Sequence, residues 1–306
     1  MSTLTAEHIL AVTDPKLLWG EDSTTRFREL AKEWHPDMCK DPNATKVMDH
    51  LMRLREAAKR GLKLEGAKEE TVIIPGGTVH FSLDAITLCS KVPTFEQAKL
   101  WIDNLRKLSP DLARRIPEPL LLSPEGTVLT LKRPPDTVSM TTVMHKYPEG
   151  VPQRHVAWIV SRLLELVMET HKIGRCVCGG LLPESMAVIV DSHGVIPLDW
   201  RFTIGNDSKL SRLPEALLSH VPKDKKARVI IDLAAVNRMA MVLLGDSSGS
   251  GNVLLLRAKK DPENMAPGFL DWFRGPVSDD PVKHYENYRA MLMEVFGKPK
   301  YYKLEL

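Results

Sequence analysis

The stretch Arg26-Phe-Arg-Glu-Leu-Ala-Lys-Glu-Trp-His-Pro-Asp37 decides the fold of the N-terminal region. Its apolar side chains recur at the spacing i, i+3, i+4, i+7, which predicts one buried stripe along an α-helix. That stripe consists of Phe27, Leu30, Ala31 and Trp34. Pro36 disfavours the helical conformation of the residue before it, so we expect the helix to end just ahead of Pro36.

A second amphipathic pattern follows at residues 44–60 and predicts another helix. Its apolar face is formed by Val47, Met48, Leu51, Leu54 and Ala58. Residues 23–25 (Ser-Thr-Thr) and 41–43 (Asp-Pro-Asn) supply N-cap side chains for the first and second helix. The two patterns together predict a helical hairpin whose polar loop contains His35, Pro36 and Asp37.

This pattern resembles the J domain of DnaJ-type co-chaperones, over about residues 1–65. In that family the His-Pro-Asp loop and the basic face of the preceding helix dock on a DnaK-type heat-shock ATPase and accelerate its ATP hydrolysis. The resemblance implies that His35, Pro36 and Asp37 act as the trigger. It also implies an electrostatic contact with an acidic partner surface through Arg26, Arg28 and Lys32. A helical hairpin with no chaperone partner is the alternative.

The composition is that of a globular protein with two or three domains. The chain has 306 residues, of which 43% are hydrophobic and 26% charged. A net charge of +3 is too small to indicate a nucleic-acid partner. No apolar stretch is long enough for a membrane helix, and the N-terminus lacks a signal-peptide pattern. We therefore expect a cytoplasmic protein with no membrane partner.

The four cysteines predict neither a disulfide framework nor a metal site. They are Cys39, Cys89, Cys176 and Cys178. The last two stand near His171 and His193, but a Cys-x-Cys pair without a second pair is not the spacing of a zinc knuckle. Inert thiols in a reducing compartment are the favoured interpretation.

Beyond a charged segment at residues 59–70, the pattern changes first to strands and then mostly to helices. Strands are predicted at 71–74, 78–81, 85–88, 120–122, 128–131, 138–144, 186–190 and 195–198, and helices at 94–108, 154–170, 229–244 and 281–296. The fold class is thus α+β: a β-rich lobe at about 70–150 precedes a larger, mostly helical lobe at 151–306.

That order, together with four spaced segments, resembles a bilobal protein kinase over roughly residues 70–302. Residues 171–185 resemble the catalytic loop, and residues 195–200 resemble the strand that ends in the metal-binding Asp, here Asp199. Residues 213–215 take the place of Ala-Pro-Glu, which makes Glu215 its final residue. Residues 231–245 resemble the helix whose buried Asp, here Asp232, braces the catalytic loop.

The resemblance also implies which kinase groups are replaced. Gly180 takes the place of the catalytic Asp and has no side chain to orient a hydroxyl. Ser185 replaces the second metal ligand, and Cys178 replaces the loop His. The sequence shows no glycine-rich phosphate loop, and no lysine is convincingly placed. We therefore expect a pseudokinase that is not an enzyme and has no cofactor, although Glu184 leaves a rearranged base open and Mg²⁺·ATP binding is not excluded.

The favoured hypothesis is a co-chaperone adaptor. Its J domain would stimulate a DnaK-type chaperone, and its kinase-like domain would bind a client protein of unknown identity. Two alternatives stay open. One is an active atypical kinase localised by its J domain. The other is a structural scaffold in a multiprotein or viral assembly.

Overall fold

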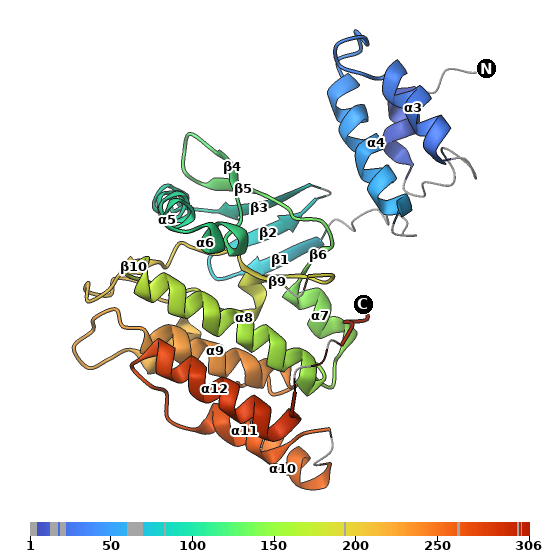
Figure 1. Cartoon of the computed structure of the whole chain (residues 1–306). Helices are drawn as coiled ribbons and strands as arrows, with labels where there is room; N and C mark the ends of the chain where they lie inside the picture. Colours follow the sequence, from blue (N-terminus) through green and yellow to red (C-terminus); the bar gives the residue numbers. More distant parts are fainter. Residues whose placement is uncertain are drawn as a thin grey trace. The chain divides into compact units, whose positions relative to one another are not determined.

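A computed structural model describes residues 5–12, 18, 23–59, 70–82, 84–192, 194–261, 264–298, 300 and 302–306 (Figure 1). The chain divides into two compact units, Met1–Glu69 and Glu70–Leu306. Each unit has a hydrophobic core of its own. None of the helices in the described ranges is long and apolar enough to cross a membrane.

The described part of the N-terminal unit contains α1 (Ala6–Ala11), α3 (Ser23–Glu33) and α4 (Ala44–Lys59). Helices α1 and α3 both pack against α4. The apolar stripes predicted from the sequence meet in the core, whose buried members are Ala6, Ile9, Leu18, Phe27, Leu30, Trp34, Val47, Leu51 and Leu54. The Arg55 guanidinium lies 4.6 Å from the centre of the Phe27 ring and covers the edge of this core.

A five-stranded antiparallel sheet forms the first lobe of the C-terminal unit. Its strands are β1 (Glu70–Ile74), β2 (Gly77–Phe81), β3 (Ala85–Ser90), β4 (Pro119–Leu122) and β5 (Val128–Lys132), in the order β1-β2-β3-β5-β4. In this register Val79 faces Leu88, and Leu88 faces Leu129. All three side chains are buried, so one face of the sheet contributes to the core. Helices α5 (Phe95–Leu108) and α6 (Pro110–Arg115) lie beside it.

The second lobe is mostly helical. Its helices are α7 (Met140–Lys146), α8 (Gln153–Lys172), α9 (Ile230–Leu243), α10 (Asn252–Lys260), α11 (Pro267–Arg274) and α12 (Pro281–Phe296). Two small sheets accompany them: β6 (Thr137–Ser139) with β8 (Met186–Ile189) and β9 (Gly194–Pro197), and β7 (Cys176–Val177) with β10 (Ile204–Gly205). Two short 3-10 helices, η1 (Pro183–Ser185) and η2 (Glu215–His220), complete the lobe.

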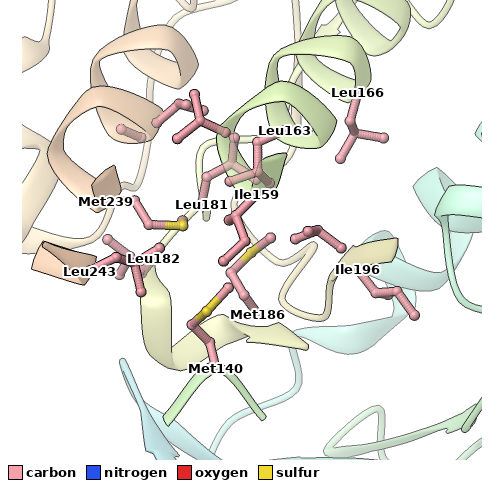
Figure 2. Close-up of a cluster of buried hydrophobic side chains, with 14 of the residues drawn as sticks. Met140, Ile159, Leu163, Leu166, Leu181, Leu182, Met186, Ile196, Met239 and Leu243 are labelled. Carbon is pink, nitrogen blue, oxygen red and sulfur yellow. The ribbon is translucent and has the colours of Figure 1, made fainter. Parts of the chain in front are cut away.

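Figure 2 shows the apolar cluster that supports this lobe. Met140 of α7, Ile159 and Leu163 of α8, Met186 of β8 and Met239 of α9 converge in it. All five side chains are buried. Leu181 and Leu182, which lie in the loop before η1, point into the same cluster. The loop that resembles a kinase catalytic loop is therefore anchored by apolar packing from several helices.

The strand predicted at residues 138–144 is mostly wrong. Only residues 137–139 form β6, and the chain continues as helix α7. The hydroxyl oxygen of Ser139 accepts a hydrogen bond of 2.8 Å from the backbone N–H of Thr142, so Ser139 is an N-cap. The β-branched residues at 141–143 favour a strand by propensity, and the cap together with core packing overrides them.

Candidate functional site

The first candidate site is the loop that joins α3 to α4. Helix α3 ends at Glu33, and the backbone N–H groups of Met38 and Cys39 both donate to the carbonyl of His35 at 2.8 Å. The backbone N–H of Asp37 also donates to Nδ1 of His35, at 3.3 Å. These bonds fold the loop into a compact turn that fixes the backbone around Pro36.

The side chains of this loop face solvent. That of His35 is 47% exposed and that of Asp37 is 86% exposed, although Nδ1 of His35 lies 3.6 Å from a carboxylate oxygen of Asp37. By contrast, Trp34 directly before the loop is buried in the core of the unit. The loop therefore presents a histidine and a carboxylate to solvent directly beside a buried tryptophan.

The three basic residues singled out on α3 are not equivalent. Arg28 and Lys32 are exposed and stand one helical turn apart. Arg26 is partly buried, and its guanidinium donates to Glu29 at 2.7 Å. Arg28 and Lys32 are therefore the charges most available to a partner.

The second candidate site is the loop after β7 in the C-terminal unit. The carboxylate of Asp232, on the buried first turn of α9, accepts hydrogen bonds from the backbone N–H groups of Cys178, at 2.7 Å, and Gly179, at 2.8 Å. Burial raises the pKa of Asp232 to about 6, and the two backbone hydrogen bonds oppose that rise. Helix α9 thus holds the loop through one carboxylate.

Gly180 and Gly179 pack too tightly for a side chain. Gly179 has φ +68°, in the left-handed region, and a Cβ there would lie 2.8 Å from the carbonyl oxygen of Phe202. A Cβ on Gly180 would lie 2.6 Å from the carbonyl oxygen of Asp199. In this structure the backbone of Asp199 and the ring of Phe202 fill the space that a side chain at Gly180 would need.

Ser185 lies beside Asp199 through the pairing of β8 with β9. The backbone N–H of Leu198 donates to the carbonyl of Ser185 at 2.9 Å. The Ser185 hydroxyl is buried and has no hydrogen-bond partner among the described residues. Gly180 and Ser185 therefore both lie against the segment that contains Leu198 and Asp199.

Asp199 forms an ion pair with Arg201, a partner that the sequence patterns did not predict. Nε and Nη2 of Arg201 donate to the two carboxylate oxygens of Asp199 at 2.8 and 2.7 Å. The side chains are 4% and 0% exposed. The sequence did contain a signal for this pair: a basic residue stands two positions after Asp199, and no lysine is convincingly placed to pair with kinase groups.

This arrangement does not fit a bound Mg²⁺. Both oxygens of the one carboxylate already accept hydrogen bonds from a guanidinium, and that carboxylate has no exposed surface. Mg²⁺ prefers octahedral oxygen coordination that includes several waters. In the state described here, Asp199 is thus an ion-pair partner and not a metal ligand.

Two adjoining cavities lie along the loop. One, of about 420 Å³, is lined by Pro75, Leu182, Glu184, Pro214, Glu215 and Ala216. The other, of about 250 Å³, shares Leu182, Glu184 and Ala216 and extends to His145 and Arg238. Glu184 is half-buried and borders both cavities, whereas Glu215 is exposed at the start of η2. Glu184 is thus the carboxylate that the two cavities share.

The thiols of Cys176 and Cys178 are buried. Burial raises the pKa of Cys176 to about 12 and that of Cys178 well above its ordinary value, with the charge of Asp232 adding to both shifts. Such thiols stay protonated at neutral pH and are poor nucleophiles. In the described part of the chain, histidines, cysteines and carboxylates do not form a group of three that could hold a metal. His193 lies outside the described residues.

The comparisons with known proteins identify the fold of the C-terminal unit. No model of a protein family matches the sequence, and no curated protein matches it. Among solved structures, the chain is similar to vaccinia related kinase 3, with a TM-score of 0.50 and 13% identity, over 74% of this chain and 87% of that one. It is also similar to the kinase PK-1 of Cydia pomonella granulovirus, with a TM-score of 0.48 and 11% identity, over 80% and 98% of the two chains.

The similarity to vaccinia related kinase 3 shows a kinase-like fold with a β-sheet lobe and a helical lobe. It also corrects the expectation that the chain is not an enzyme. That expectation rested on replaced residues alone and is contradicted, because the solved structure that this chain resembles is a kinase. The acidic residues near the loop of this kinase-like fold are Asp199, Asp232 and Glu184.

Proposed function

We propose that this chain is a kinase-fold protein that its N-terminal unit brings to a DnaK-type heat-shock ATPase. The observation that carries the proposal is the exposed loop His35-Pro36-Asp37 at the end of a helix with exposed basic side chains. A J domain docks through the same three residues and the same helix. The buried core beneath the loop supplies the rigid support that docking needs.

The charges on the docking surface support an acidic partner. Arg28 and Lys32 are exposed on α3 and attract a negatively charged surface at long range. Docking can alter the partner's ATP hydrolysis only if the loop binds one conformational state of the partner better than another. The N-terminal unit would therefore shift the partner toward the conformational state that it binds better, and it would perform no chemistry itself.

Binding of the full chain to a purified DnaK-type ATPase, measured by calorimetry in the presence of ATP, tests this proposal. We expect His35→Gln to weaken binding at least about tenfold, the effect of losing about 1.4 kcal/mol of contact energy. Met38→Ala is the matched control, since Met38 is 74% exposed in the same loop and has no assigned role. Equal binding by all three proteins would contradict the proposal.

Phosphoryl transfer is a second candidate activity, and the kinase fold favours it. The space at Gly180 holds no carboxylate, so Glu184 would be the group that orients the attacking hydroxyl. This role is consistent with the half-buried position of Glu184 beside both cavities.

A phosphate-transfer assay tests this second activity, with radiolabelled ATP, Mg²⁺ and the full chain as both enzyme and substrate. We expect Glu184→Gln to reduce incorporation at least about a hundredfold, the usual contribution of a general base. Glu125→Gln, in an exposed turn of the β-sheet lobe, should leave it unchanged. No incorporation by the unaltered chain, or full incorporation by Glu184→Gln, would contradict the assignment.

A further inference from the structure

Arg201 connects the two lobes of the kinase-like unit. Its guanidinium pairs with Asp199, which lies just after β9 in the helical lobe. The same guanidinium donates to the backbone carbonyl of Pro75 at 2.7 Å and to that of Gly76 at 3.4 Å. Pro75 and Gly76 form the turn between β1 and β2, so one side chain ties the edge of the sheet to the carboxylate of the other lobe.

The groups around Arg201 are suited to binding a guanidinium. Besides these four hydrogen bonds, the guanidinium carbon lies 5.3 Å from the ring centre of Phe95 and 5.7 Å from that of Phe202. Arg212 donates to the backbone carbonyl of Arg201 at 3.1 Å and holds the segment in place. A buried charge that is paired in this way is costly to leave without its partner.

We propose that Arg201 is a latch that closes the β1–β2 turn onto Asp199 and occupies the place where a divalent cation would meet that carboxylate. Such a latch would regulate the site and has two consequences, of which only the second rests on the proposed phosphoryl transfer. The first consequence is mechanical: without the guanidinium, the turn loses the hydrogen bonds at Pro75 and Gly76 that tie it to the helical lobe. The second is chemical: Asp199 becomes available to Mg²⁺·ATP only when Arg201 leaves it.

Hydrogen exchange of the full chain, monitored over residues 72–80, tests the mechanical consequence. We expect Arg201→Gln to speed exchange of the β1–β2 turn roughly tenfold, the effect of losing one charge-assisted hydrogen bond. Arg106→Gln is the matched control, because Arg106 also donates to backbone carbonyls, those of Ala113 and Ile116, but within one lobe. If Arg201→Gln fails to fold, the double variant Asp199→Asn with Arg201→Gln removes both buried charges and carries the same expectation.

Titration of the same proteins with Mg²⁺·ATP tests the chemical consequence. We expect Arg201→Gln to bind Mg²⁺·ATP at least about tenfold more tightly than the unaltered chain. Unchanged exchange of the turn would overturn the latch, and equal nucleotide affinity would overturn its exclusion of the cation. Faster exchange with no nucleotide binding by any variant would retain the mechanical latch and reject both the exclusion and the proposed phosphoryl transfer.

Discussion

The carboxylate of Asp232 accepts a hydrogen bond of 2.8 Å from the backbone N–H of Gly179, which lies 53 residues earlier in the chain. A second bond, from the N–H of Cys178, uses the other carboxylate oxygen. Both partners belong to the loop that borders the candidate site, and Asp232 is 1% exposed. One buried side chain of α9 therefore sets the path of the loop and positions Gly180, the next residue along it.

Replacement of Asp232 by Ala should destabilise the C-terminal unit. It leaves the backbone N–H groups of Cys178 and Gly179 buried without acceptors, at a cost of about 3 kcal/mol in the free energy of unfolding. Asp271→Ala, on an exposed position of α11, should change that free energy by less than about 0.5 kcal/mol. Urea unfolding of the full chain measures both values, and similar values for the two variants would contradict the role given to Asp232.

A side chain at position 180 should not supply the catalytic aspartate that the kinase resemblance would place there. A Cβ there would lie 2.6 Å from the carbonyl oxygen of Asp199, so Gly180→Ala should cost about 1–3 kcal/mol of stability. Gly180→Asp should cost at least as much and should not increase phosphate transfer. Gly205→Ala is the control, since its Cβ would meet only the side chain of Ser208, at 3.4 Å. Unfolding curves that rank Gly205→Ala as the more damaging change would refute this account of the loop.

The stability of the N-terminal unit should fall in weak acid because of His50. This residue is 5% exposed, and its Nε2 lies 2.8 Å from the carbonyl oxygen of Val12. Burial lowers the pKa of His50 below its ordinary value of 6.5, so the unfolded chain binds the proton more readily than the folded unit. The resulting stability is present above that ordinary value and is lost as the pH falls through the folded-state pKa.

Hydrogen exchange of the α4 amides in the full chain, corrected for intrinsic rates, measures this loss between about pH 7 and about pH 5. His50→Gln keeps an N–H group that can reach the Val12 carbonyl but does not titrate. The variant should therefore show a flatter dependence on pH. An identical dependence in the two proteins would rule out His50 as the source.

Reversal of the charges on α3 should slow association with the chaperone. Arg28→Glu with Lys32→Glu should reduce the association rate roughly tenfold at low salt, and the difference should shrink as salt screens it. Lys107→Glu, exposed in the other unit, is the control for a charge reversal away from α3, and each of the two α3 reversals made singly is compared with it. Stopped-flow rates at two salt concentrations give the answer, and a loss that persists at high salt would point to misfolding or to a contact other than long-range attraction.

Local patterns predicted the helices with strong periodicity. The stripe through Phe27 and Leu30 and the face through Val47 and Leu51 are buried as predicted, because spacing along a helix determines which side chains share a face. Helices α10 and α11 were not predicted. They are short, and α10 packs against α11, which in turn packs against α9 and α12, so their burial depends on contacts that no local window contains.

The candidate site, like the helices, was predicted only in part from the sequence. The kinase resemblance assigned Gly180, Ser185 and Asp199 to positions of a kinase cleft. It did not reveal that Arg201 occupies Asp199, because the carbonyls that complete the pocket belong to Pro75 and Gly76, over a hundred residues away. Nor did it reveal that the backbone of Asp199 and the ring of Phe202 leave no room beside Gly180.

The central claim is that the loop at His35 acts on the ATPase of a chaperone partner. It is tested most directly by single-turnover hydrolysis of ATP by a purified DnaK-type protein, alone and with the full chain. We expect the full chain to accelerate hydrolysis and His35→Gln, at an exposed position that leaves the core intact, to abolish the acceleration. Equal acceleration by the two proteins, or none by either, would contradict the claim.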